Sequence, residues 1–157
     1  IPLHQKRNMR HYIIYIKWEK SQFEGYVYQE LGLDVVEKIE SPDFNQFIQL
    51  AEGCIEILEP EFLETDSRYP EWYKNQEYDF TYQFADVASL LKAYNTYVPL
   101  ATLSKATHIN KGLLSHYANR LKVPREKQRD TIIKTFQEIG TRLMNTKVEF
   151  KNRDYEI

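Results

Sequence analysis

Two sets of apolar residues between positions 97 and 120 constrain the fold of this chain most strongly. The first set recurs at every third position, the spacing of one face of a short helix, and comprises Leu100, Leu103, Ala106 and Ile109. The second set has the i, i+1, i+4 spacing of another helix and comprises Leu113, Leu114 and Tyr117. The pattern predicts two short helices that pack on each other through these faces, with a tight turn at Ile109.

A longer helix is predicted to open at Pro124, because proline is favoured at the first helical position. It would bury apolar residues from Ile132 to Leu143 and end near Asn145. The helix before it, expected over residues 110–119, would then keep a polar outer face. Helices arranged in this way form a helix-turn-helix, whose second helix enters the major groove of DNA.

Charge is divided unevenly along the chain. Residues 1–96 carry 9 Lys and Arg against 17 Asp and Glu, whereas residues 97–157 carry 12 against 6. The net charge of −2 conceals this asymmetry. We expect phosphate to be repelled by the N-terminal part and attracted by the C-terminal part.

The polar outer face of the predicted 110–119 helix supplies the candidates for contact with base edges, which are Lys111, Ser115, His116 and Asn119. Lys111, Ser115 and Asn119 fall on one i, i+4 line. Candidates for phosphate contact on the neighbouring segments are Thr102, Lys105, Arg120, Lys122, Arg125 and Lys127. The alternative for each of them is an ordinary solvated helix residue.

The segment from Leu103 to Leu143 resembles the helix-turn-helix of Cro/repressor-type regulators. The residues that carry the resemblance are Leu103, Ala106, Ile109, Asn110, Leu114, Tyr117 and Pro124. Residues 77–150 resemble, more specifically, HicB-type antitoxins with such a domain, through INKGLLSHYANRLKVPREKQ and the later IGTRL. Two departures from the pattern are His108, where the family has glycine in the turn, and the missing Leu-Pro-Gly-Cys signature of the toxin-binding domain in residues 34–60.

The N-terminal part is rich in β-forming residues, and its short turns predict an antiparallel meander of strands at 10–18, 23–29 and 35–40. Gly25 suggests a bulge in the second strand. Ser41-Pro42-Asp43 would open a helix, with Ser41 as its cap and Pro42 at its first position. The helix would run to Glu59 and cover one face of the meander. The resemblance implies that this part is a partly degraded ribonuclease-H-like domain.

Residues 77–84 alternate aromatic and polar side chains, a pattern that predicts a strand. Asp86 would then cap a short helix over residues 87–94. Its aromatic face would pack in its own domain or against a second subunit. The predicted fold class is α+β, a β-meander with a covering helix followed by an all-α helix-turn-helix domain that the aromatic strand precedes. The expected domains are 1–66, a β-rich interaction domain; 67–76, an acidic linker; and 77–157, the helix-turn-helix domain.

Several classes of protein are disfavoured. The chain has no apolar run near the roughly 18 residues that a membrane span needs. Cys54 is the only cysteine, which argues against a disulfide framework or a cysteine-based zinc site and favours a cytoplasmic setting. The carboxylates of the N-terminal strands are scattered, without a two-metal arrangement. We therefore expect no enzymatic activity, no cofactor and no metal.

These observations predict a homodimeric, sequence-specific transcriptional regulator, which resembles an autoregulating antitoxin and binds a double-stranded DNA operator through the helix at 110–119. The alternative is a protein-interaction module in which the acidic N-terminal domain neutralises a small basic toxin or another basic protein. In that case DNA binding would be secondary or lost.

Overall fold

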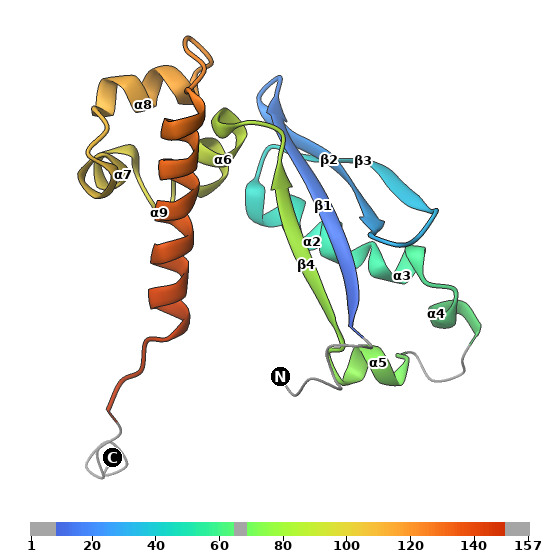
Figure 1. Cartoon of the computed structure of the whole chain (residues 1–157). Helices are drawn as coiled ribbons and strands as arrows, with labels where there is room; N and C mark the ends of the chain where they lie inside the picture. The colour runs from blue at the N-terminus through green and yellow to red at the C-terminus, as the bar shows by residue number, and fades with distance from the viewer. Residues whose placement is uncertain (1–8, 65–68, 150–157) are drawn as a thin grey trace, which may run out of the picture. The chain divides into compact units, whose positions relative to one another are not determined.

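A computed structural model describes residues 9–64 and 69–149 of the chain (Figure 1). The protein is α+β, as predicted, with a four-stranded mixed sheet; along the chain, helices lie between the third and fourth strands and after the fourth. The chain divides into two compact units, Ile1–Asn95 and Thr96–Ile157. This division falls after the aromatic strand and not at residues 67–76, where the sequence suggested a linker.

The first three strands form the expected antiparallel meander: β1 (Arg10–Glu19), β2 (Gln22–Gln29) and β3 (Val35–Ser41). The register shifts between Gly25 and Val27, which confirms the bulge in β2. Gly25 also has no room for a side chain, since a Cβ there would lie 1.7 Å from the carbonyl oxygen of Tyr15. The close approach of the two backbones explains why glycine stands at this position.

The aromatic strand β4 (Tyr78–Phe84) belongs to the first unit, where it pairs in parallel with β1 and completes the sheet order β3-β2-β1-β4. Placing residues 77–84 with the C-terminal domain therefore does not match the structure. The rings of Phe80 and Tyr12 lie 5.8 Å apart, so the aromatic face packs within its own unit. Two parallel strands must be joined by a long crossover connection. The residues next to β4 in the sequence therefore do not indicate that β1 is its partner.

The covering helix is shorter than predicted. Asp43 caps helix α2 (Phe44–Gly53) by accepting a hydrogen bond from the backbone N–H of Gln46. Ser41, the expected cap, is instead the last residue of β3. The helix breaks at Cys54, and α3 (Ile55–Leu58) follows as a separate turn. Glycine at the end of α2 favours this break over a continuous helix to Glu59.

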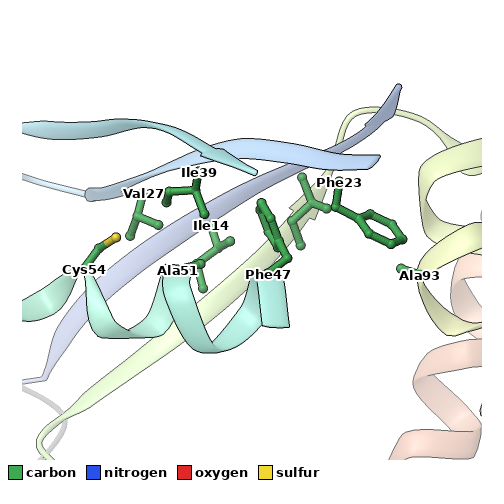
Figure 2. Close-up of a cluster of buried hydrophobic side chains, with 9 residues drawn as sticks. Ile14, Phe23, Val27, Ile39, Phe47, Ala51, Cys54 and Ala93 are labelled. Carbon is green, nitrogen blue, oxygen red and sulfur yellow. The ribbon is translucent and has the colours of Figure 1, made fainter. Parts of the chain in front are cut away.

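The core of the first unit lies between α2 and one face of the sheet. Figure 2 shows side chains of the strands pointing toward side chains of α2, and the labelled set comprises Ile14, Phe23, Val27, Ile39, Phe47, Ala51, Cys54 and Ala93. Ala93 comes from α6 (Val87–Tyr94), whose N-terminus is capped by Asp86 as its sequence predicts. Burial raises the pKa of the Cys54 thiol, so this cysteine is a packing residue.

Residues of the expected linker form part of the first unit. Helices α4 (Glu61–Glu64) and α5 (Glu71–Lys74) bring Trp72 beneath the guanidinium of Arg10, which lies 4.0 Å from the ring centroid. Arg10 also forms a 2.8 Å ion pair with the buried Glu59, and the Tyr12 hydroxyl donates a 2.5 Å hydrogen bond to the same carboxylate. These contacts hold the start of β1 against α5 and Glu59. Of the expected linker, residues 67 and 68 lie outside the described residues.

The second unit contains α7 (Leu100–Thr107), α8 (Lys111–Ala118) and α9 (Glu126–Met144). Pro124 precedes α9 by two residues, and Arg125 occupies its N-cap, so the predicted start at Pro124 is early. Leu103, Leu114 and Ile132 are fully buried, one from each helix. Ala106, predicted on the buried face of α7, is exposed.

Candidate nucleic-acid interface

A turn of three residues, His108-Ile109-Asn110, joins α7 to α8. His108 takes the left-handed conformation with φ 61°, which ends α7. The next side chain, Ile109, is buried under the two helices. The Ser104 hydroxyl donates a 2.5 Å hydrogen bond to the carbonyl oxygen of Ile109, while the Ile109 N–H donates to the Thr107 hydroxyl at 3.2 Å. The turn is therefore held by side chains of α7.

The N-terminus of α8 is capped by Asn110, a role that asparagine before a helix commonly takes but that we did not predict for it. The side-chain oxygen of Asn110 accepts hydrogen bonds from the N–H groups of Gly112 at 2.8 Å and Leu113 at 3.4 Å. A Cβ on Gly112 would lie 3.0 Å from this oxygen. The glycine thus leaves room for the cap, which offsets part of its low helix propensity.

The inner face of α8 fixes the helix against the rest of the second unit. Leu114 and Tyr117 are buried, as predicted, whereas Leu113 is only partly buried. The Tyr117 hydroxyl donates a 2.9 Å hydrogen bond to the side-chain oxygen of Gln128, on α9. Together with the burial of Leu114 and Tyr117, this bond holds one side of α8 against its unit and leaves the other side exposed to solvent.

The C-terminus of α8 ends in a Schellman motif. The Leu121 N–H donates to the carbonyl oxygen of His116 at 2.8 Å, and the Arg120 N–H donates to that of Tyr117 at 3.2 Å. Arg120 occupies the left-handed position, with φ 58°, where glycine is usual. Both turns that flank α8 therefore hold a nitrogen-rich side chain where glycine would be less strained.

The predicted base-reading line is only partly formed. Lys111 and His116 are exposed on α8, and Ser115 is half-buried. Asn119 is the C-cap of the helix, and its side-chain amide turns back to donate to the Ser115 carbonyl oxygen at 3.0 Å. An asparagine close to a helix end caps it more readily than it extends into solvent. The exposed polar residues of α8 are therefore concentrated at Lys111 and His116.

The start of α8 is unusually positive. Lys111 is the first helical residue, and the first turn has no acidic residue. A helix N-terminus already carries a partial positive charge, so a lysine there costs roughly 0.3–1 kcal/mol. A negatively charged ligand at this end of α8 would turn that cost into attraction.

The candidate phosphate contacts are exposed around α8: Thr102, Lys105, Arg120, Lys122, Arg125 and Lys127. The nearby carboxylates of α9 are matched by other cations, since Glu126 and Asp130 pair with Arg129, and Glu138 pairs with Lys134. Within residues 96–149, no ion pair engages Lys105, Lys111, Lys122, Arg125 or Lys127. These cations remain available to an anionic partner.

A second polar and aromatic surface lies in the first unit, on the sheet face opposite α2. Strand alternation puts Tyr15 and Tyr26 there, with stacked rings 4.8 Å apart, and Tyr26 is 37% exposed. Glu24 and Glu40 are paired in register on neighbouring strands of the same face. The alternation of residues along β1 and β2 could have indicated this exposed face, but the prediction considered only the face that is buried.

The described residues contain no group of three or more His, Cys, Asp or Glu that could hold a metal ion. None of the helices in the described ranges has both the length and the apolar character that crossing a membrane requires. Comparison with known proteins gives no match to a family model, a curated protein or a solved structure.

Proposed function

We propose that this protein is a sequence-specific DNA-binding transcriptional regulator, in which α7, the three-residue turn and α8 form a helix-turn-helix and α8 enters the major groove. The observation that carries the proposal is the N-terminus of α8, where Lys111 adds charge to the positive end of a helix dipole. The first residues of a recognition helix are those that meet base edges. Lys111 would donate to guanine, with His116 and Ser115 near it.

Further features of the second unit support DNA as the anionic partner. The turn has the length usual for this motif, and Tyr117 holds α8 against α9. Cations free of ion pairs lie on the segments before and after α8, where phosphates flank a groove. The charge of residues 97–157, 12 Lys and Arg against 6 Asp and Glu, gives the long-range attraction that nucleic-acid binding needs. The proposed activity is binding, not catalysis.

The test is a fluorescence-anisotropy titration of the full chain with duplexes tiled across the DNA upstream of its own coding sequence. The proposal predicts one preferred duplex and an affinity that falls steeply as salt rises from about 50 to about 200 mM. Replacing Lys111, Ser115 and His116 together by alanine should remove the preference. Lys134→Ala is the matched control, since Lys134 is paired with Glu138 on α9. Unchanged sequence preference in the triple variant would contradict the assignment of α8.

We propose as a second candidate function that the first unit binds a basic protein, as the resemblance to HicB-type antitoxins suggests. The observation that favours it is the partly open tyrosine face of the sheet, with carboxylates in register beside it. Tyrosine rings and carboxylates together suit lysine and arginine side chains. The mixed sheet with α2 on one face also agrees with a degraded ribonuclease-H-like domain.

This candidate is tested by co-expression with the protein encoded next to it. Neutralisation of a toxic basic neighbour should be lost in Tyr15→Ala/Tyr26→Lys and kept in Lys111→Ala. The converse result, loss with Lys111→Ala alone, would place the antitoxic effect in DNA binding and contradict capture by the sheet.

A further inference from the structure

Strand β4 ends the sheet, and among the described residues β1 is the only strand beside it (Figure 1). At one end of this pairing the Arg10 N–H donates to the Glu77 carbonyl oxygen at 3.0 Å. At the other end the Ala85 N–H donates to the Ile16 carbonyl oxygen at 2.9 Å. Odd-numbered residues from 77 to 85 thus direct their backbone groups toward β1, so even-numbered residues direct theirs away from the sheet. The outward N–H and carbonyl groups are those of Tyr78, Phe80, Tyr82 and Phe84.

The other edge of the sheet, formed by β3, is protected against a further strand. The bulge interrupts its register with β2, and Lys38 takes the left-handed conformation with φ 61°. Glu37, Lys38 and Glu40 add charge to this edge. Bulges and charged side chains are common means of preventing edge-to-edge association. Strand β4 lacks both devices, since its register with β1 is continuous over its whole length and Asp79 is its only charged residue.

The two faces of β4 set a requirement for any strand that joins this edge. Its aromatic residues lie on the side of the sheet that carries α2, but α2 packs mainly on β2 and β3. The Tyr82 ring is 38% exposed, although its hydroxyl donates a 2.5 Å hydrogen bond to Glu52. On the opposite face, Asp79, Thr81 and Gln83 are exposed. An added strand therefore needs apolar side chains on one face and polar side chains on the other.

A second copy of β4 satisfies this requirement. A two-fold axis through Thr81, perpendicular to the sheet, would pair two β4 strands antiparallel over their whole length. Phe80 would then lie opposite Tyr82 of the second copy, and Tyr78 would lie opposite Phe84. Aromatic pairs of this kind stabilise neighbouring strands. The same pairs hold all the outward N–H and carbonyl groups, so each pair would exchange two hydrogen bonds.

The polar face is complementary in the same register. Asp79 would lie opposite Gln83 of the second copy, whose amide can donate to the carboxylate, and Thr81 would meet Thr81 on the axis. An axis at Asp79 would instead bring two carboxylates together, which is destabilising. Axes at the neighbouring aromatic residues would leave one end of β4 without an opposite residue. The axis at Thr81 is therefore the register that uses the whole strand.

We propose that the β4 edge binds a second copy of the chain, with the two strands antiparallel about Thr81 and the two sheets joined into one. The paired strands are about 24 Å long, since a strand rises about 3.4 Å per residue. Such a contact is smaller than a standard interface, so we expect dissociation in the micromolar range. This association goes beyond the DNA binding proposed above and does not depend on it.

Sedimentation equilibrium of the full chain at about 50 mM salt, without DNA, tests the association. Thr81→Lys should weaken dimerisation at least about threefold, because two lysines would meet on the axis. Gln83→Lys is the matched control on the same face of β4. It places the same charge opposite Asp79 of the second copy, so it should leave dimerisation unchanged or strengthen it.

Far-UV circular dichroism checks that both variants keep their fold, which the exposure of the two positions favours. A chain that stays monomeric at about 100 µM would overturn the proposal and leave this edge to a strand of a different protein. Dimerisation that is no weaker in Thr81→Lys than in Gln83→Lys would also overturn it, because the contact would then lie elsewhere.

Cross-linking tests the register. In a Cys54→Ala background, Thr81→Cys should form a disulfide between two copies, because opposite Cα atoms at such a position lie about 4.5 Å apart, within the roughly 4.4–6.8 Å that a disulfide spans. Asp79→Cys should not, because the two copies of this position would lie about 14 Å apart along the strands. No linkage in Thr81→Cys, or equal linkage in Asp79→Cys, would contradict the axis at Thr81. Since no DNA is present, failure of operator binding would leave these results unaffected.

Discussion

The Ser104 hydroxyl donates a 2.5 Å hydrogen bond to the carbonyl oxygen of Ile109, five residues ahead, across the left-handed turn at His108. This bond couples the last full turn of α7 to the entry of α8. Because Ile109 is buried, its carbonyl oxygen lies at the edge of the core of the second unit. Loss of the bond would therefore leave a poorly solvated acceptor.

Ser104→Ala should lower the free energy of unfolding of the second unit by about 1 kcal/mol, measured by urea denaturation. The hydroxyl is lost, while the higher helix propensity of alanine restores only about half of the effect. Thr102→Ala is the matched change at an exposed position of the same helix and should be neutral or slightly stabilising. Equal effects of the two substitutions would show that the Ser104 hydrogen bond makes no net contribution to the free energy of unfolding.

His108→Gly should stabilise the second unit by roughly 0.5–1 kcal/mol. The left-handed conformation strains a residue with a Cβ, and glycine removes that strain at a smaller entropic cost. His116→Gly, inside α8, should instead destabilise by about 1 kcal/mol. Thermal unfolding measures both variants, which make the same His→Gly change at positions with different backbone conformations. A loss of stability in His108→Gly would show that the imidazole makes a stabilising contact.

Arg10→Met should destabilise the first unit by about 2–3 kcal/mol, because it leaves the buried Glu59 carboxylate without its cation. The hydrogen bond from Tyr12 remains but does not neutralise the charge. Lys17→Met removes an exposed ion pair with Glu19 and should cost less than about 0.5 kcal/mol. Chemical denaturation followed by tryptophan fluorescence measures both, and similar losses would contradict the role given to Glu59.

Acid should weaken the same corner of the first unit. Burial raises the pKa of Glu61, but hydrogen bonds from its backbone and from Arg10 outweigh burial and hold the pKa below its ordinary value. A lowered pKa stabilises the folded state above the ordinary pKa, and this contribution disappears as pH falls through the lowered value. The unfolding free energy should therefore fall below about pH 4.5, and it should fall less in Arg10→Met than in the unchanged chain. An equal fall in both would contradict the link to Arg10.

Local patterns in the sequence predicted the elements well where a cap or an alternation defines them. Helix α6 begins after Asp86 as predicted, and the bulge at Gly25 is where the glycine suggested it. Both depend on neighbouring residues only, since a cap and a bulge are set by the backbone close to one side chain.

Features that depend on distant residues were not predictable in the same way. The aromatic strand β4 pairs with β1, from which it is separated by more than half of the sequence of the first unit. The residues next to β4 in the sequence therefore could not show to which unit it belongs. The break after Gly53 divides a helix whose apolar spacing looks continuous. At the candidate interface, Asn119 has the spacing of a base contact but folds back onto Ser115, because a helix C-terminus offers it a carbonyl acceptor.

Lys111→Glu tests the central claim most directly, because it separates binding from folding. A glutamate in the first turn of α8 interacts favourably with the helix dipole, so the variant should be at least as stable as the unchanged chain. If Lys111 contacts a base edge, the variant should bind its preferred duplex about 10- to 100-fold more weakly, measured by fluorescence anisotropy. A folded Lys111→Glu protein that binds the same duplex within about threefold of the unchanged chain would contradict DNA reading by α8.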